Sequence, residues 1–347
     1  MRDNANLKQA NLMHGTVEIH EMQSAVLAGN PLGDPAQRRM PVYLPPGYSS
    51  TSDRFPTVYF LHGFSGSGTS WLNSTCFTPN VIERLDDLIG KEVIPPVLGV
   101  FVDGWTALGG SQWINSEAIG RYREYLARDV VTHFDQTLRT VAKATSRAVV
   151  GKSSGGYGAL AMASRHPEVF AHVASHSGDA YFEYCYLPEF PKAAGPLLKA
   201  GGVEPWFREF SQRARETRVR SEDFPVINLI AMSAAYSPKK GEPMGLELPF
   251  DLPTARIRPD VWGRWLVNDP VRFVPRNLPA LAKLSSLFID CGTRDEYSLR
   301  WGARMLVDEL RAAQIEVVHE EFEDGHMGIN YRYDRSLAYI APRMARS

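Results

Sequence analysis

A serine between glycines, in Gly151-Lys152-Ser153-Ser154-Gly155, is the residue of this chain best suited to nucleophilic chemistry. The segment matches Gly-x-Ser-x-Gly. It joins a short apolar run that ends at Val150 to a run with helical spacing over residues 157–166. A sharp strand-to-helix turn pushes such a serine into solvent above a sheet, and small glycines let the backbone make the turn. The pattern therefore predicts a nucleophile elbow with Ser153 at its tip.

Two other interpretations of the same residues compete with this one. A glycine-rich loop that only joins a strand to a helix would have a similar composition. Gly151-Lys152-Ser153 also resembles the end of a phosphate-binding loop, but that motif needs a glycine five residues before the Gly-Lys pair, where this chain has Ser146. We therefore reject the phosphate-binding interpretation.

A nucleophilic serine needs a base and an orienting carboxylate, which follow it in chain order in this kind of site. His326 follows the last expected strand in a glycine-flanked loop, so it is the expected base. Asp295 lies in the turn after the penultimate strand and is the favoured acid. Asp290, at the end of that strand, and Glu296 remain alternatives, and Asp290 could instead cap nearby backbone amides.

Negative charge that develops on an attacked carbonyl oxygen needs prepositioned donors. One donor is expected from the amide of Ser154, the residue after the nucleophile, and the other from the amide of Phe64. Phe64 belongs to the glycine-rich segment 62–68, whose glycines allow the loop to aim backbone N–H groups. An ordinary strand-to-helix connection is the alternative interpretation of this loop.

Length, charge and cysteine content limit the class of protein. The chain has 347 residues, 44% of them hydrophobic, and a formal net charge of -1, which argues against nucleic acid or an anionic membrane surface as the main partner. Its three cysteines form neither a disulfide framework nor a metal-ligand spacing, so no metal or other cofactor is expected. The polar stretch 1–12 lacks a secretory core and no apolar run is long enough to span a bilayer, so a cytoplasmic protein is expected.

Segments with strand-like and helix-like patterns alternate along the chain, and these segments position the candidate site residues. Strands are expected over residues 16–26, 38–44, 56–61, 97–102, 146–150, 172–175, 285–290 and 316–322, and helices over 119–138, 157–166, 299–313 and 329–344. Several of these strands are nearly continuous apolar runs, as in a parallel sheet covered on both faces. The order predicts a single α/β domain over residues 1–347, with a mostly parallel central sheet and helices on both sides.

Residues 180–275 interrupt this alternation. These 96 residues hold 12 of the 24 prolines and 14 of the 37 aromatic residues, too many prolines for a long helix or a sheet core and too many aromatics for a disordered linker. The composition predicts a folded lid inserted into the domain. Its tryptophans and neighbouring aromatics either line an acyl or aryl pocket or form the core of the lid itself: Trp206, Phe207, Trp262 and Trp265.

Several motifs together resemble the putative esterase (esterase D-like) family of α/β-hydrolases. That family includes S-formylglutathione hydrolases, feruloyl esterase domains, enterochelin esterases and the antigen 85 mycolyltransferases. The matching segments cover about residues 40–180 and 280–335, and include Tyr43-Leu44-Pro45-Pro46-Gly47-Tyr48, Val58-Tyr59-Phe60-Leu61-His62-Gly63, Trp113-Ile114-Asn115-Ser116, Gly155-Gly156-Tyr157-Gly158-Ala159-Leu160 and Ser175-His176-Ser177-Gly178.

The resemblance implies an α/β-hydrolase fold with Ser153 as nucleophile, His326 as base, Asp295 as acid and the amides of Phe64 and Ser154 as oxyanion donors. The expected activity is that of a serine carboxylesterase that cleaves a small-molecule acyl or thio ester through an acyl-enzyme. An acyltransferase that uses the same triad is the main alternative, and a hydrolase-fold binding protein with a vestigial site is the other. Exposed lid aromatics are compatible with a homodimer.

Overall fold

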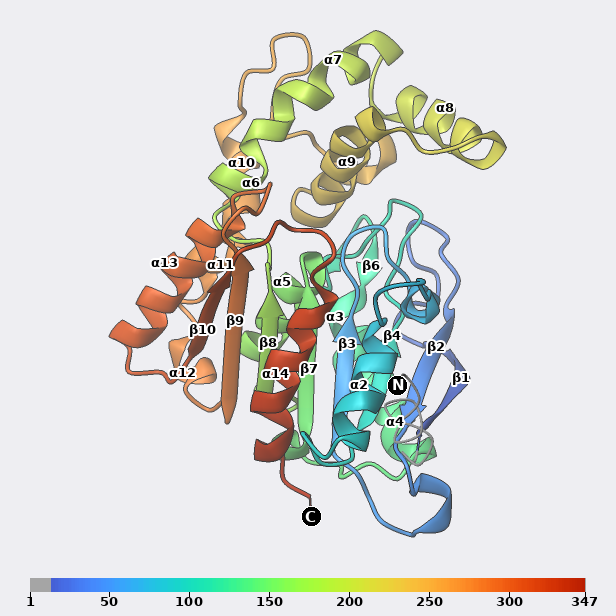
Figure 1. Ribbon diagram of the computed structural model, residues 1–347. Helices are drawn as coiled ribbons and strands as arrows, with labels where there is room; N and C mark the ends of the chain where they lie inside the picture. Colours follow the sequence, from blue (N-terminus) through green and yellow to red (C-terminus); the bar gives the residue numbers. More distant parts are fainter. Residues whose placement is uncertain (1–13, 347) are drawn as a thin grey trace, which may run out of the picture.

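An eight-stranded sheet forms the centre of the molecule in residues 14–346, which the computed structural model describes (Figure 1). The polar stretch 1–12, on which the expectation of a cytoplasmic protein rests, lies outside these residues. In spatial order the strands are β1 (Thr16–Gln23), β2 (Gln37–Leu44), β4 (Leu98–Val102), β3 (Thr57–Leu61), β7 (Arg147–Lys152), β8 (His172–His176), β9 (Ser286–Gly292) and β10 (Val318–Phe322). The β1–β2 and β2–β4 pairs are antiparallel and the pairs from β4 to β10 are parallel. The predicted α/β class with a mostly parallel sheet is confirmed.

Helices cover both faces of this sheet. The described α-helices and the π-helical turn η3 are α2 (Val81–Gly90), α3 (Tyr122–Glu124), η3 (Tyr125–Val130), α4 (Val131–Thr137), α5 (Ser154–Arg165), α6 (Phe182–Cys185), α7 (Phe190–Ala200), α8 (Val203–Glu216), α9 (Phe224–Tyr236), α10 (Pro259–Val267), α11 (Pro270–Phe273), α12 (Leu278–Leu281), α13 (Leu299–Ala312) and α14 (Arg332–Ile340). A further two-stranded ribbon pairs β5 (Asn115–Ser116) with β6 (Gly120–Arg121).

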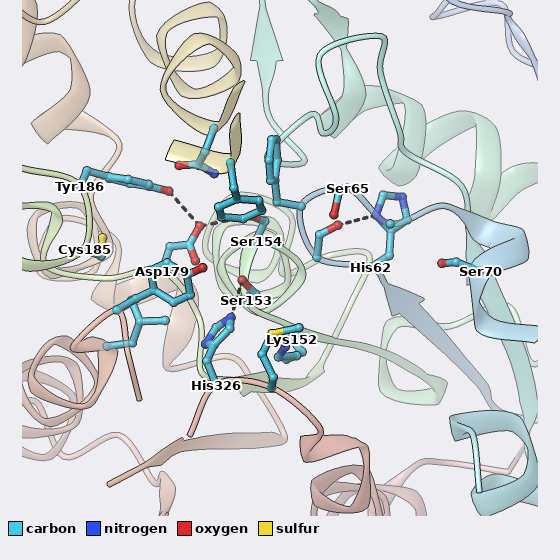
Figure 2. Close-up of a pocket in the computed structure, with 18 of the residues that line it drawn as sticks. His62, Ser65, Ser70, Lys152, Ser153, Ser154, Asp179, Cys185, Tyr186 and His326 are labelled. Atoms are coloured by element: carbon cyan, nitrogen blue, oxygen red, sulfur yellow. Dashed lines mark hydrogen bonds between the residues drawn. The ribbon is translucent and has the colours of Figure 1, made fainter. Parts of the chain in front are cut away.

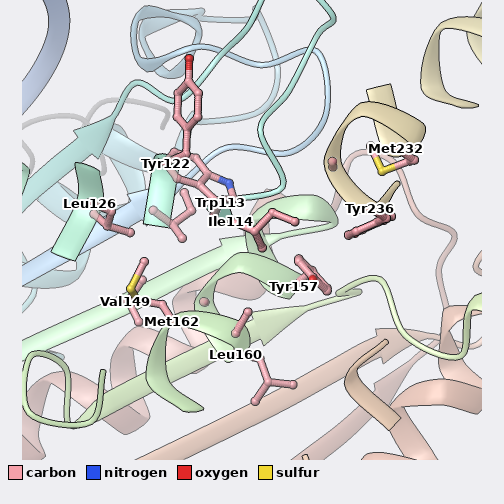
Figure 3. Packing of buried hydrophobic residues seen from close by; sticks show 14 of the residues in the cluster. Trp113, Ile114, Tyr122, Leu126, Val149, Tyr157, Leu160, Met162, Met232 and Tyr236 are labelled. Carbon is pink, nitrogen blue, oxygen red and sulfur yellow. The ribbon is translucent and has the colours of Figure 1, made fainter. Parts of the chain in front are cut away.

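Burial on both faces explains why the central strands are apolar at every position. Along β3, Val58 and Phe60 pack with residues of α2 and α14, whereas Tyr59 and Leu61 face the larger core that contains α5 and α13. Side chains alternate across a strand, so a strand covered on both sides needs apolar residues throughout. Figure 3 shows part of the larger core around Tyr157 of α5.

Some expected elements differ in length or type from the observed ones. The first strand ends at Gln23 instead of continuing to residue 26, because the chain turns at residues 25–29. The helix expected over 119–138 starts as β6, where Gly120 has a φ of 122°, and includes a π-helical turn. An apolar pattern read from the sequence does not reveal a single π turn within an α-helix, because such a turn alters the spacing of only a few residues.

The chain between β8 and β9 contains α6 to α12, and α7 to α10 stand at one end of the sheet (Figure 1). The insertion packs on the core of the domain: the ring of Tyr236 in α9 lies 6.1 Å from that of Tyr157 in α5. Over residues 14–346, we find no helix both long enough and apolar enough to cross a membrane.

Candidate active site

The elbow predicted at Ser153 is a tight turn between β7 and α5. Ser153 has a φ of 59° and a ψ of −129°, a conformation that is strained for a residue with a side chain. The glycines allow close approach of the backbone: a Cβ on Gly151 would lie 2.4 Å from the backbone of Gly155, and a Cβ on Gly155 would lie 2.1 Å from the carbonyl oxygen of Leu61. The Ser153 amide donates to the carbonyl of His176 at 2.9 Å, which ties the turn to β8.

Ser153, His326 and Asp295 form a continuous hydrogen-bonded row. The Oγ of Ser153 lies 3.0 Å from Nε2 of His326 (Figure 2). The Nδ1 of His326 lies 2.8 Å from Oδ2 of Asp295. His326 lies in the loop after β10 and Asp295 in the loop after β9, and both residues are buried. The other carboxylate oxygen of Asp295 accepts the backbone N–H of Tyr297 at 2.9 Å, which holds the carboxylate in this orientation.

The two alternative acids have other contacts. Oδ1 of Asp290 lies 2.8 Å from Nδ1 of His176, and its Oδ2 accepts from Nε of Arg332, also at 2.8 Å. Glu296 accepts the backbone N–H of His326 at 2.6 Å and so contacts the main chain, not the imidazole. Asp295 is therefore the carboxylate that the fold brings to the ring of His326.

The loop after β3 lies directly against the elbow. A Cβ on Gly63 would be 3.3 Å from Cβ of Ser153, so this glycine lets the loop approach the serine closely. The amides of Phe64 and Ser154, the two expected oxyanion donors, have no hydrogen-bond acceptor within residues 14–346. Both N–H groups are therefore free to bind a ligand at this site.

His62 helps to shape this loop as a neutral imidazole. Burial lowers the pKa of His62. Its Nε2 accepts the backbone N–H of Gly104 at 3.0 Å, so the ring proton is on Nδ1, which donates to the carbonyl of Gly63 at 2.9 Å. The indole of Trp113 donates to the carbonyl of His62 at 3.2 Å. These contacts fix the backbone that precedes Phe64.

A cavity of about 340 Å³ opens above Ser153. Its walls come from the loops after β3, β7, β8, β9 and β10 and from the insertion, which contributes Tyr186, Glu189, Phe224 and Asn228. The four lid aromatics singled out in the sequence are not among its lining residues. Trp262 and Trp265 instead pack against Phe190, with ring centroids 5.5 and 5.7 Å away, and so belong to the core of the insertion.

The structure also brings to the cavity a carboxylate that the sequence patterns did not reveal. Asp179 follows β8 and is buried beside Ser153 and Ser154. Burial raises the pKa of Asp179, and hydrogen bonds from Gln112 and Tyr186 act in the opposite direction. The signal that could have found it is its position just past a strand end, where site residues of parallel sheets gather.

The chain resembles known proteins both in sequence and in structure. Residues 35–331 match the sequence model of a family described as "Putative esterase". The endo-1,4-beta-xylanase/feruloyl esterase of Xylanibacter ruminicola is 28% identical over 144 residues, which are 40% of this chain and 19% of that protein. Esterase Rv1288 of Mycobacterium tuberculosis is 28% identical over 164 residues, 46% of this chain and 34% of that protein. The matched region is thus about a third or less of the length of these relatives.

Solved structures resemble nearly the whole chain. A ferulic acid esterase superposes with a TM-score of 0.61 and 15% identity, covering 96% of this chain and 100% of its own. An S-formylglutathione hydrolase from Agrobacterium tumefaciens gives a TM-score of 0.57 and 16% identity, covering 96% and 97% of the two chains. At these identities the likeness shows the fold, which is that of the α/β-hydrolases.

Proposed function

The chain belongs to the Putative esterase family, and from that premise we propose that it is a serine carboxylesterase that works through an acyl-enzyme. The observation that carries the proposal is the row from Ser153 through His326 to Asp295, with separations of 3.0 and 2.8 Å. A serine hydroxyl within hydrogen-bond reach of an imidazole, itself oriented by a buried carboxylate, is the arrangement that activates serine as a nucleophile.

In the first half of the reaction Oγ of Ser153 attacks the carbonyl carbon of the ester while Nε2 of His326 takes the hydroxyl proton. The oxyanion of the tetrahedral intermediate accepts hydrogen bonds from the amides of Phe64 and Ser154. As the bond to the leaving oxygen breaks, His326 returns the proton to the alcohol, and the acyl group stays on Ser153.

In the second half a water molecule attacks the acyl-enzyme and gives its proton to His326, which passes a proton back to Oγ of Ser153 as the acid leaves. Asp295 keeps the proton of the resting imidazole on Nδ1, so that Nε2 is free to accept one. A thiol leaving group would follow the same steps. An acceptor alcohol in place of water would make the enzyme an acyltransferase.

Hydrolysis of p-nitrophenyl esters of increasing acyl length, compared between the wild type and Ser153→Ala, tests this proposal. We expect the substitution to lower turnover by a factor on the order of 10⁶. Labelling of the wild type, but not of the variant, by a fluorophosphonate probe is the matched control for a reactive serine. Hydrolysis that is unchanged in Ser153→Ala, or a wild type that neither hydrolyses these esters nor reacts with the probe, would refute the assignment.

A further inference from the structure

Asp179 stands apart from most buried acids of this protein because no basic side chain pairs with it within residues 14–346. Asp269 is paired with Arg272, Asp290 with Arg332, and Asp223 with Arg213. A buried carboxylate without a cation is costly unless something else compensates its charge. Asp179 lines the cavity above Ser153, so a ligand in that cavity can supply the compensation.

The surroundings of Asp179 hold its carboxylate in one orientation. Its Oδ2 accepts from the amide of Gln112 at 3.0 Å, from the hydroxyl of Tyr186 at 2.9 Å and from Oγ of Ser154 at 3.3 Å. The other oxygen, Oδ1, accepts no hydrogen bond from residues 14–346 and is not fully buried. Figure 2 shows the carboxylate beside Ser153 on the side of Tyr186. One oxygen is thus anchored by neutral donors while the second is free for a ligand.

Acidic groups gather on this side of the cavity. Glu189 and Tyr297 line the cavity together with Asp179. The pKa of Tyr297 is raised by burial and by the nearby carboxylates, Glu189 and Asp179 foremost. Lys152 is the one basic side chain other than histidine that lines the cavity in the described part of the chain. It lies on another side of Ser153, with its Nζ 3.7 Å from the sulfur of Met327. Carboxylate oxygens and aromatic rings together suit a cation better than a neutral hydroxyl.

We propose that Asp179 is a specificity-determining residue that binds a protonated amine of the substrate, so that the preferred substrates are carboxylic esters with an ammonium group near the scissile bond. The inference rests on the proposed esterase function. The ammonium group donates to Oδ1 of Asp179 and lies among Tyr186, Tyr297 and Glu189, while the ester carbonyl reaches Ser153. The acyl part and the alcohol part of an ester could each carry this amine, and the two cases share the same recognition chemistry.

Two pairs of esters of matched shape distinguish these cases. β-Alanine ethyl ester and ethyl butyrate differ by an ammonium in place of a methyl group on the acyl side. 2-(Dimethylamino)ethyl acetate and 3-methylbutyl acetate differ by a protonated tertiary amine in place of a CH group on the alcohol side. Acid release followed in a pH-stat at neutral pH gives kcat/KM for each ester. We expect the cationic member of one pair to be preferred by the wild type.

The variant Asp179→Asn removes the charge and keeps the shape. We expect the preference for the cationic member to fall about 10- to 100-fold, chiefly through KM, because a charge-assisted hydrogen bond is lost. Tyr186→Phe removes one donor to Oδ2 but keeps the charge of Asp179, the aromatic ring at position 186 and the donors Gln112 and Ser154. It should therefore leave the preference within about threefold of the wild type. This pair of variants separates recognition of charge from support of the site.

Hydrolysis of the neutral esters by the wild type, and its loss in Ser153→Ala, tests the esterase proposal separately. The inference about Asp179 is overturned if the wild type shows no preference for the cationic member of either pair. It is also overturned if Asp179→Asn slows both members of the preferred pair equally, or if Tyr186→Phe loses the preference to the same extent. If Asp179→Asn slows both members of the preferred pair equally, Asp179 has a structural role only.

Discussion

The positions of individual carboxylate oxygens determine which acid forms a hydrogen bond with the imidazole of His326. Asp290, Asp295 and Glu296 lie within seven residues of one another, yet only Oδ2 of Asp295 lies 2.8 Å from Nδ1 of His326. Glu296 supports the same loop through the backbone N–H of His326. The two neighbours therefore hold the histidine by different atoms, and their substitution should have different consequences.

The variant Asp295→Asn tests this difference at the level of one residue. The amide can donate to Nδ1 and so favour the tautomer with its proton on Nε2, which cannot accept a proton from Ser153. We expect kcat/KM for a p-nitrophenyl ester to fall about 10⁴-fold.

Glu296→Gln keeps an acceptor for the backbone of His326, and activity should stay within about tenfold of the wild type because the hydrogen bond can still form. Circular dichroism checks that both variants are folded. Equal losses in the two variants would contradict the roles assigned to these acids.

At the scale of elements, the site depends on how closely α5 approaches β3. Gly155 at the start of α5 contacts the carbonyl of Leu61 at the end of β3, one residue before the loop that carries Phe64. The spacing of these two elements sets the distance between Ser153 and the amide of Phe64. The glycines of the elbow are thus required both by the turn and by the packing of the helix on the neighbouring strand.

Gly155→Ala is expected to push α5 away from β3, because the new Cβ would lie 2.1 Å from the oxygen of Leu61. Overpacking of this kind lowers the free energy of unfolding by about 1–3 kcal/mol, and we expect esterase activity to fall as well. Gly263→Ala in α10 is the matched control, because among residues 14–346 no atom outside its chain neighbours and its own helix backbone lies within 4 Å of the new Cβ.

The control should raise the free energy of unfolding by about 0.5–1 kcal/mol through helix propensity. Urea denaturation measures both changes. A Gly155→Ala protein as stable and as active as the wild type would show that the elbow does not need this close contact.

In the molecule as a whole, the insertion between β8 and β9 has a hydrophobic core of its own and also forms part of the wall of the cavity. Trp265 is fully buried among aromatic residues of the insertion, and its indole donates to Oγ of Ser237 at 2.9 Å. Phe224, by contrast, lines the cavity, and its ring lies 5.6 Å from that of Phe64. One aromatic residue therefore stabilises the insertion, while the other links it to the site.

These two positions should respond differently to truncation. Trp265→Ala is expected to lower the free energy of unfolding by about 3–5 kcal/mol, and the remaining activity should keep the same dependence on acyl chain length. Phe224→Ala widens the cavity and should shift that dependence toward longer acyl chains. Urea denaturation and the p-nitrophenyl ester series measure the two effects. A change of acyl preference in Trp265→Ala without lost stability would overturn this division.

Features that depend on residues close together in the chain follow from the amino-acid sequence alone. The Gly-x-Ser-x-Gly turn, the apolar strands and the chain order of Ser153, Asp295 and His326 follow from local backbone preferences and from the period of the apolar residues. Each of the eight predicted strands overlaps a strand of the observed sheet, and the family resemblance agrees with the family match.

Three features depend on the packing of the folded chain: which of the nearby acids faces His326, which lid aromatics line the cavity, and the position of Asp179 beside Ser153. Ser153 and His326 are 173 residues apart, and Gln112 and Asp179 are 67 apart. The order of strands in the sheet and the packing of the insertion bring such pairs together. No local pattern encodes these distances, because they arise from contacts between elements that are remote in the chain.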